Sequence, residues 1–294
     1  SNPQCVYSIT DYNSRYYVLM RMGIEQDISI IITANPSTIV ELQNNVNEYF
    51  DEYVNDIEHG TISSKLNIAA EIRAELEACV KPNPKRAAEL RALKEKYGTV
   101  LPKHYWPNLQ VLNTWKCGNT DKYIEKFQGS FPDHMLHMEF GYFASECRFG
   151  LVMDDSLNTV LFPHFHYYEF VREEDMDSEN PEFLQLDQLE EGKRYCPFVT
   201  TWAGLYRYNM TDLLEVGPKY RNSPTVHLIQ KTKGIVSMTG EKLYEKQFCD
   251  AVHQVEQETG MMTRFFVGFA DQERSSYDFY WEFSDRSTTQ EQAE

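Results

Sequence analysis

Residues Thr200–Asp212 read TTWAGLYRYNMTD and hold the clearest structural pattern in the chain. Two β-branched residues end one predicted strand, Ala203-Gly204 gives a turn, and aromatic residues begin a second strand that leads to Asp212. A carboxylate in this place can accept two hydrogen bonds, and the vicinal hydroxyls of a ribose offer two donors. A plain hairpin with a surface aspartate stays open as an alternative, and Arg207 is equally suited to a structural ion pair with an acid.

The sequence on both sides of this segment predicts more short strands. They are rich in β-branched and aromatic residues and cover Gly150–Met153, Val160–Phe170, Phe198–Thr201, Leu205–Tyr208 and Val226–Gln230. Because tight loops join them, we expect an antiparallel sheet or a distorted barrel over about residues 148–230.

The first third of the chain has an α/β pattern. A short β-branched run, Asp27–Thr33, predicts a buried strand. Asn35-Pro36 and Asn83-Pro84 each predict a helix start, because asparagine caps helices well and proline suits the first helical position. Apolar residues at helical spacing continue the first of these helices to Ile57. With further strands over Val111–Trp115 and His137–Phe140, this alternation predicts an α/β fold with mixed sheets flanked by helices.

The last third predicts a strand over 235–238, a helix over about 241–258 and a hairpin over 263–283. We therefore expect two domains: residues 1–230 as a large domain with the strand-rich part at its end, and 231–294 as a hinge and the start of a small C-terminal domain. Since that small α/β unit begins without a visible completion, the chain is expected to be a fragment.

Composition excludes several classes of protein. With 28 Lys and Arg against 45 Asp and Glu, the net charge is −17, which argues against a general nucleic-acid binder because that role needs a basic face. No segment approaches the roughly 18–20 apolar residues of a membrane span. The N-terminus lacks the features of a secretory signal. Six cysteines without a C-x-x-C pair predict reduced thiols in a cytoplasmic protein, with one or two incidental disulfides as the alternative.

The segment Glu169–Glu191 carries ten acids and one base, and we interpret it as a solvated, mobile loop between strands. His164 and His166 face the same side of a predicted strand, with Glu169 near them. These three could bind zinc, but no further ligand has metal-site spacing, so packing or surface histidines are favoured.

A second segment with chemical potential runs from His137 to Glu146 and reads HMEFGYFASE. A predicted strand leads into small residues and a carboxylate, which is where α/β proteins place groups that contact ligands. Tyr142 could stack on a base while Glu146 holds a metal ion. A purely structural turn is the alternative.

Taken together, the two segments resemble the adenylate-forming superfamily of acyl- and aryl-CoA synthetases and luciferase. The Gretchen-Hagen (auxin-responsive) branch, the acyl acid amido synthetases, is the most similar. Residues Tyr142–Gly150 are similar to its aromatic-Ala-Ser-Ser-Glu-Cys-aromatic-Phe-Gly pattern, and Thr200–Asp212 matches its Thr-Thr-Tyr-Ala-Gly-Leu-Tyr-Arg-Tyr-Arg-x-Gly-Asp pattern nearly throughout. Ser237–Lys242 is similar to its hinge segment, and weaker likeness extends to Lys81–Pro84 and Trp106–Asn108.

The resemblance implies an acyl-CoA synthetase-like fold and a ligase that uses ATP and Mg²⁺. A carboxylic acid would be converted to an acyl-adenylate, and the amine of an amino acid would then form the amide. By resemblance, Tyr142 would stack on adenine, Ser145 would belong to the nucleotide site and Asp212 would bind the ribose. Glu146 would hold Mg²⁺, and Lys242 would contact the α-phosphate as the catalytic lysine.

Two departures from the family pattern stand out. Thr211 replaces the glycine before the motif aspartate, which could alter the turn that presents Asp212. The phosphate loop expected before these segments is absent, so the chain is expected to be the central part of a longer protein and to be inactive by itself. A catalytically inactive nucleotide- or acid-binding module and an acyl-CoA ligase remain the alternatives, and no motif indicates which acid is used.

Overall fold

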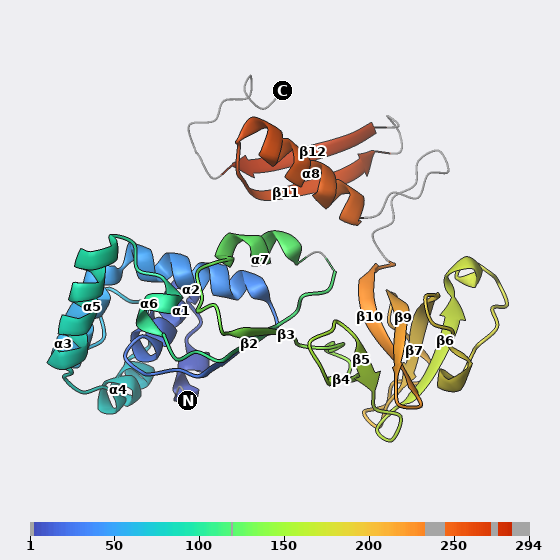
Figure 1. Ribbon diagram of the computed structural model, residues 1–294, viewed down its shortest axis with the longest axis horizontal. Helices are drawn as coiled ribbons and strands as arrows, with labels where there is room; N and C mark the ends of the chain where they lie inside the picture. The colour runs from blue at the N-terminus through green and yellow to red at the C-terminus, as the bar shows by residue number, and fades with distance from the viewer. Residues whose placement is uncertain (1–2, 119, 233–244, 272–275, 284–294) are drawn as a thin grey trace. The chain divides into compact units, whose positions relative to one another are not determined.

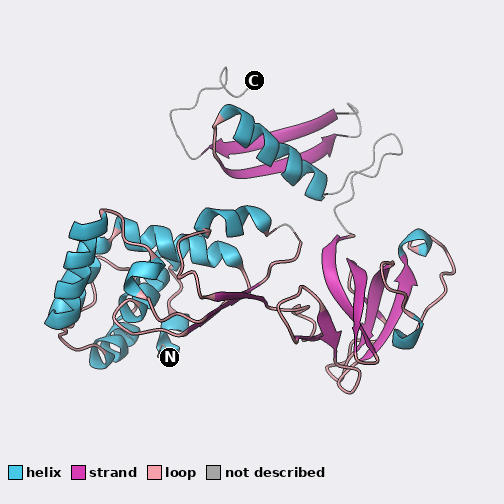
Figure 2. Cartoon of the chain, viewed as in Figure 1, coloured by secondary structure: helices cyan, strands magenta, loops and turns pink. Residues whose placement is uncertain are grey.

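The computed structural model describes residues 3–118, 120–232, 245–271 and 276–283 (Figure 1). The chain divides into two compact units: unit 1 holds residues 1–116, 123–140 and 154–156, and unit 2 holds residues 117–122, 141–153 and 157–294. Figure 2 shows that most helices lie in unit 1, whereas unit 2 is dominated by strands. This division of secondary structure agrees with the expected mixed α/β fold with a strand-rich part.

Unit 1 is built on a three-stranded parallel sheet in the order β1-β2-β3, formed by β1 (Ile30–Ile32), β2 (Val111–Thr114) and β3 (Leu136–Glu139). Ile31 pairs with Leu112, and Asn113 pairs with Met138. Its helical elements are η1 (Gln4–Ser8), α1 (Tyr12–Gly23), α2 (Pro36–Glu48), α3 (Phe50–His59), α4 (Ala70–Cys79), α5 (Pro84–Tyr97), α6 (Pro102–Tyr105) and most of α7 (Asp121–Phe127).

Both predicted helix starts are confirmed. The Asn35 side chain accepts a hydrogen bond from Ser37 N–H, and the Asn83 side chain accepts one from Arg86 N–H, with proline at the first helical position in each case. The single helix expected from Pro36 to Ile57 is wrong, because the chain leaves helical geometry at Tyr49 (φ −109°, ψ 23°), between α2 and α3. The apolar spacing persists across this break, since both helices pack on one core.

The strand expected over Asp27–Thr33 is present, but its predicted burial is wrong. Within β1 only Ile31 packs against the core, while Ile30 and Ile32 are exposed. Successive side chains of a strand point to opposite faces, and only one face of β1 is packed on the core.

Unit 2 contains an antiparallel sheet of seven strands in the order β4-β5-β10-β9-β7-β6, with β8 paired to β7. The order is open, with β4 and β6 at its ends, so the described strands form a sheet and no closed barrel. One apolar core, which includes Tyr142, Phe149, Tyr168 and Val226, packs this part together. The strands are β4 (Gly150–Val152), β5 (Thr159–Leu161), β6 (Tyr167–Arg172), β7 (Arg194–Thr200), β8 (Tyr208–Asn209), β9 (Asp212–Tyr220) and β10 (Ser223–Lys231), with the short helices η2 (Glu173–Asp175) and η3 (Leu186–Gln188) between β6 and β7.

The acidic segment Glu169–Glu191, which begins within β6, is more ordered than expected. Glu169, Leu184 and Leu189 are buried, and Leu184 exchanges both backbone hydrogen bonds with Phe170. The interpretation of Glu169–Glu191 as a solvated loop is therefore wrong at these anchoring residues, because apolar side chains spaced among the acids reach the core.

The last described part consists of α8 (Glu245–Thr259) and the hairpin of β11 (Thr263–Asp271) and β12 (Ser276–Phe283). Phe248 of α8 packs on Tyr277 and Phe279 of β12, with each pair of ring centroids 5.5 Å apart. The strand expected over 235–238 and the start of the helix expected near 241 lie outside the described residues. The predicted domain boundary at 230/231 stays a prediction.

None of the six cysteines forms a disulfide. Cys79 at the end of α4 is exposed, whereas Cys196 on β7 is buried. Burial raises the pKa of the Cys196 thiol to about 12, because the apolar surroundings disfavour the thiolate.

Candidate functional site

Residues 142–149 fold into a tight turn. Phe149 N–H donates to the Tyr142 carbonyl at 3.1 Å, and Ala144 N–H donates to the Cys147 carbonyl at 3.1 Å. The turn has Ser145 and Glu146 at its tip, where Ser145 is exposed and Glu146 is half-buried. A rigid turn thus presents the small polar residue and the carboxylate together.

Tyr142 lies at the buried base of this turn and is only 5% exposed. Its ring stacks on Phe149 with centroids 4.1 Å apart, and its backbone N–H donates to Thr159 Oγ1 at 2.9 Å. Its hydroxyl donates to Asp212 Oδ2 at 2.6 Å. Burial, with the Asp212 carboxylate beside it, raises the pKa of Tyr142 well above its ordinary value, so the phenol stays protonated and remains a donor.

Asp212 is the first residue of β9 and is 1% exposed, which excludes the alternative of a surface aspartate. The antiparallel register of β9 and β10 places Lys231 directly across from it. Lys231 Nζ lies 2.6 Å from Asp212 Oδ1, while Tyr142 holds Oδ2. A buried carboxylate needs such partners, since desolvation penalises an unpaired charge heavily. Lys231 was not predicted from the sequence as a site residue.

Glu146 belongs to the same neighbourhood. Its charge adds to the rise in the pKa of Tyr142, and it adds to burial in raising the pKa of the Cys147 thiol to about 11. The structure thus brings three of the predicted residues, Tyr142, Glu146 and Asp212, into one region although they are up to 70 positions apart. Lys242 lies outside the described residues.

The backbone before Asp212 keeps a glycine-like conformation at Thr211, whose φ is +54°. Asn209 Oδ1 accepts a hydrogen bond from Thr211 N–H at 2.8 Å, and the Thr211 carbonyl accepts one from Thr232 N–H at 2.7 Å. A β-branched residue with positive φ is a strained exception. The departure from the family pattern at Thr211 therefore preserves the turn and adds strain to it.

Replacing this residue by glycine should stabilise the protein. A left-handed conformation costs an L-residue about 1–2 kcal/mol, and the larger freedom of glycine in the unfolded chain offsets about 0.4–1 kcal/mol of that. We expect Thr211→Gly to raise the free energy of unfolding by about 0.5–1 kcal/mol in urea titrations. Thr232→Gly is the matched control and should lower it, because its φ is not positive. A Thr211→Gly protein no more stable than the unaltered one would show that the turn is unstrained.

The candidate zinc ligands do not form a site. Both Glu169 oxygens accept from the Arg207 guanidinium, at 2.9 Å and 2.7 Å, which is the structural ion pair left open for Arg207. Among the described residues, no group of three or more His, Cys, Asp or Glu side chains is arranged to hold a metal ion. A single carboxylate such as Glu146 fits Mg²⁺, since that ion keeps several waters and takes further oxygens from phosphates.

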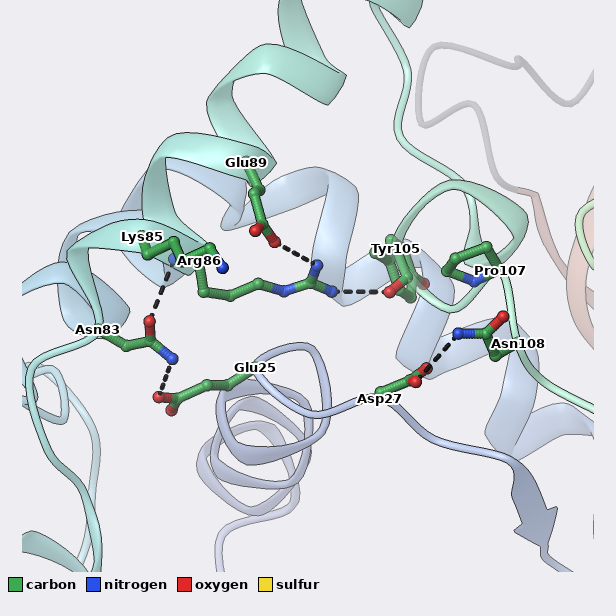
Figure 3. Close-up of a pocket in the computed structure, with 9 residues that line it drawn as sticks. All are labelled: Glu25, Asp27, Asn83, Lys85, Arg86, Glu89, Tyr105, Pro107 and Asn108. Atoms are coloured by element: carbon green, nitrogen blue, oxygen red, sulfur yellow. Dashed lines mark hydrogen bonds and ion pairs between the residues drawn. The ribbon is translucent and has the colours of Figure 1, made fainter.

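A cavity of about 350 Å³ in unit 1 is lined partly by the two segments of weaker likeness, through Asn83, Pro107 and Asn108 (Figure 3). Arg86 crosses it and donates to the carbonyls of Ile24 and Tyr105. Ligand pockets are mostly apolar with a few polar groups that await a partner. Here the main polar groups already bind one another, so the cavity marks a junction between α1, α5 and α6.

In unit 2 a turn carboxylate, a buried tyrosine and the first residue of a strand, an aspartate, thus lie close together and define one candidate site. The GH3 family N-terminal domain matches residues 1–136, and the GH3 family central domain matches residues 159–231. The chain belongs to the GH3 family.

Individual relatives agree with this assignment. The chain is 25% identical to indole-3-acetic acid-amido synthetase GH3.10 of Arabidopsis thaliana over 96% of its length and 52% of that relative. It is 24% identical to jasmonoyl-L-amino acid synthetase GH3.5 of Oryza sativa subsp. japonica over 93% of its length and 51% of that relative. The chain therefore spans about half the length of the curated relatives it matches.

The fold is also that of a solved structure. The structure of GH3.15 acyl acid amido synthetase superposes with a TM-score of 0.78 at 22% identity, covering 99% of this chain and 53% of that one. This likeness establishes the fold and agrees with the expected α/β class with an antiparallel, strand-rich part. No helix in the described part of the chain is both long and apolar enough to cross a membrane.

Proposed function

We propose that the chain is part of an ATP-dependent acyl acid amido synthetase, and that the whole protein joins a carboxylic acid to an amino acid in the cytoplasm. The observation that carries this proposal is the 2.6 Å hydrogen bond from the Tyr142 hydroxyl to Asp212, because it unites the two motif segments in one buried site. The relatives named above conjugate indole-3-acetic acid or jasmonate, as their names state, which supports a carboxylic acid and an amine as the substrate classes.

In the proposed reaction, a carboxylate oxygen attacks the α-phosphorus of ATP, and the bond to the bridging oxygen breaks to release pyrophosphate. The amine of the amino acid then attacks the acyl carbon, the acyl–phosphate bond breaks, and AMP leaves as the amine gives up its proton. No protein nucleophile is needed. Catalysis rests on orienting the two substrates and on opposing the negative charge that develops at phosphorus.

Asp212 is proposed to accept the ribose hydroxyls. Its two oxygens have lone pairs beyond those used by Tyr142 and Lys231, since a carboxylate offers about four acceptor positions. Lys231 is half-exposed, so its ammonium can move away from Asp212 and meet an incoming anion. Tyr142 is proposed to act chiefly by orienting Asp212, because its ring is buried against Phe149. Its stacking on adenine stays a prediction.

Glu146 and Ser145, at the tip of the turn, are proposed to face the phosphates. Glu146 would hold Mg²⁺, which supplies positive charge to the phosphate oxygens. Lys242, outside the described residues, is proposed to contact the α-phosphate. The turn over residues 142–149 is held by backbone hydrogen bonds, so substitutions of the Ser145 or Glu146 side chain should leave it folded.

The test is to incubate the whole protein with ATP, Mg²⁺, a panel of carboxylic acids and a mixture of amino acids, and to search for amides by mass spectrometry. We expect an amide together with equal amounts of AMP and pyrophosphate. A thioester formed only when coenzyme A is present would identify an acyl-CoA ligase. AMP binding without release of pyrophosphate from ATP, whichever acid is added, would identify a binding module. Either outcome would overturn the proposal.

A further inference from the structure

The ion pair between Glu169 and Arg207 is unlike the surface pairs elsewhere in unit 2. Glu169 is 5% exposed on β6, and its two oxygens accept from Arg207 Nε and Nη2. The guanidinium also lies over the Phe183 ring, 4.6 Å from its centroid. The head of Arg207 is therefore fixed in position and in orientation, as a bidentate pair with a stacked face requires.

The backbone of Arg207 is fixed as well. Its φ is +42°, a conformation that few residues without glycine's freedom adopt, and its N–H donates to Thr200 Oγ1 at 2.9 Å. Strained backbone persists only where the surrounding structure over-determines it, and it gathers at functional sites. Here the contacts that hold the strained backbone of Arg207 in place come from Glu169 on β6 and Thr200 on β7.

Arg207 begins the short run that leads to Asp212. Five positions separate the two residues, and the run between them contains the second strained residue, Thr211. At its far end Asp212 is held by Tyr142 and Lys231. The run is thus clamped at both ends, and a shift of Arg207 would be transmitted along a backbone that has little freedom to absorb it.

The ion pair between Glu169 and Arg207 is expected to add little to the free energy of unfolding. The Arg207 side chain is about half exposed, and ion pairs with an exposed partner contribute little to the free energy of unfolding. Burying Glu169 also has a desolvation cost that an apolar side chain would avoid. A role in geometry accounts for both features.

We propose that Glu169 is a positioning residue for the nucleotide site: through Arg207 it fixes the backbone from Arg207 to Asp212, so that the Asp212 carboxylate is already oriented for a ribose. This inference rests on the proposed function, because it assumes that Asp212 receives a nucleotide. Glu169 itself touches neither Asp212 nor, in this proposal, the nucleotide.

The experiment measures AMP affinity by calorimetry for Glu169→Gln, Arg207→Gln and the double variant of the 294-residue protein. Loss of a preorganised binding geometry should weaken AMP binding by about tenfold in each single variant. The double variant should be no weaker than either single one, since both substitutions break one pair. The matched control is Glu215→Gln, which breaks the Arg194–Glu215 pair of the same sheet and should leave AMP affinity unchanged.

A second readout separates positioning from general stability. With 5-fluorotryptophan incorporated, the ¹⁹F signal of Trp202, assigned through Trp202→Phe, reports on the loop that Arg207 closes. We expect this signal alone to sharpen or shift in Glu169→Gln, with the other three tryptophan signals unmoved. Unchanged AMP affinity, or equal effects of Glu169→Gln and Glu215→Gln, would overturn the inference. If AMP fails to bind the unaltered protein, the proposed nucleotide site is wrong, and an unmoved Trp202 signal would then reject the loop anchoring separately.

Discussion

Asp212→Asn should weaken AMP binding by about 10- to 100-fold, because hydrogen bonds to a charged acceptor contribute about 1.5–3 kcal/mol each and those to a neutral amide about half of that. The substitution preserves the shape of the side chain and one acceptor for the Tyr142 hydroxyl. It removes the charge that Lys231 faces at 2.6 Å and places an amide donor where a ribose would need an acceptor.

Isothermal titration calorimetry with AMP provides the measurement, and circular dichroism checks that the variant is folded. Glu215→Gln, three residues along the same strand and paired at the surface with Arg194, should bind AMP like the unaltered protein. Equal affinities for all three proteins would mean that Asp212 serves only the packing of β9 against Tyr142, and the proposed ribose contact would have to be abandoned.

Gly150→Ala should destabilise unit 2 by about 3 kcal/mol or more. The added methyl group would clash with backbone atoms, and clashes that only a backbone shift can relieve are among the most destabilising core substitutions. A Cβ at Gly150 would lie 2.1 Å from the Val160 carbonyl oxygen and 2.6 Å from Thr159 Cγ2. The clash falls between the paired strands β4 and β5, where Gly150 faces Leu161. It also displaces Thr159, whose hydroxyl holds the backbone of Tyr142.

Scanning calorimetry and hydrogen exchange of the peptides from β4 and β5 measure this effect. Leu151→Ala is the matched control on the same strand, and because Leu151 is exposed we expect it to cost about 0.5 kcal/mol. If the exchange rates in β4 and β5 match those of the unaltered protein, the two strands accommodate the added methyl group and the prediction is wrong.

Local patterns predicted much of the fold. The Asn-Pro pairs placed two helix starts correctly because capping depends on neighbouring residues alone. The end of the long helix at Tyr49 was missed, since apolar spacing continues through it and nothing local marks the break. The burial of β1 was also misjudged, because a run of three isoleucines does not show that only one face of the strand meets the core.

In the candidate site, too, the residues that local motifs contain were predicted and those placed by long-range pairing were missed. Tyr142, Glu146 and Asp212 were found through short motifs, which depend on consecutive residues. Lys231 and Thr159 were missed because their places depend on strand register, which a single sequence leaves open. Glu169 was considered only as a zinc ligand beside His164 and His166, because its true partner Arg207 lies 38 positions away and the sequence does not show this pairing. Long-range pairing, rather than residue type, is what the sequence failed to reveal.

The buried thiol of Cys196 on β7 can be used to measure how often the sheet of unit 2 opens. Alkylating reagents attack the thiolate, and Cys196 combines burial with a pKa of about 12, whereas Cys79 is exposed at the end of α4. At neutral pH, Cys196 should therefore react only in molecules in which strands of the seven-stranded sheet have transiently separated. The labelling rate of Cys196 divided by that of an unfolded peptide then gives the population of this open state. Ligands that bind at Asp212 and close the sheet would slow this labelling, so a thiol reagent could screen for them without any knowledge of the reaction.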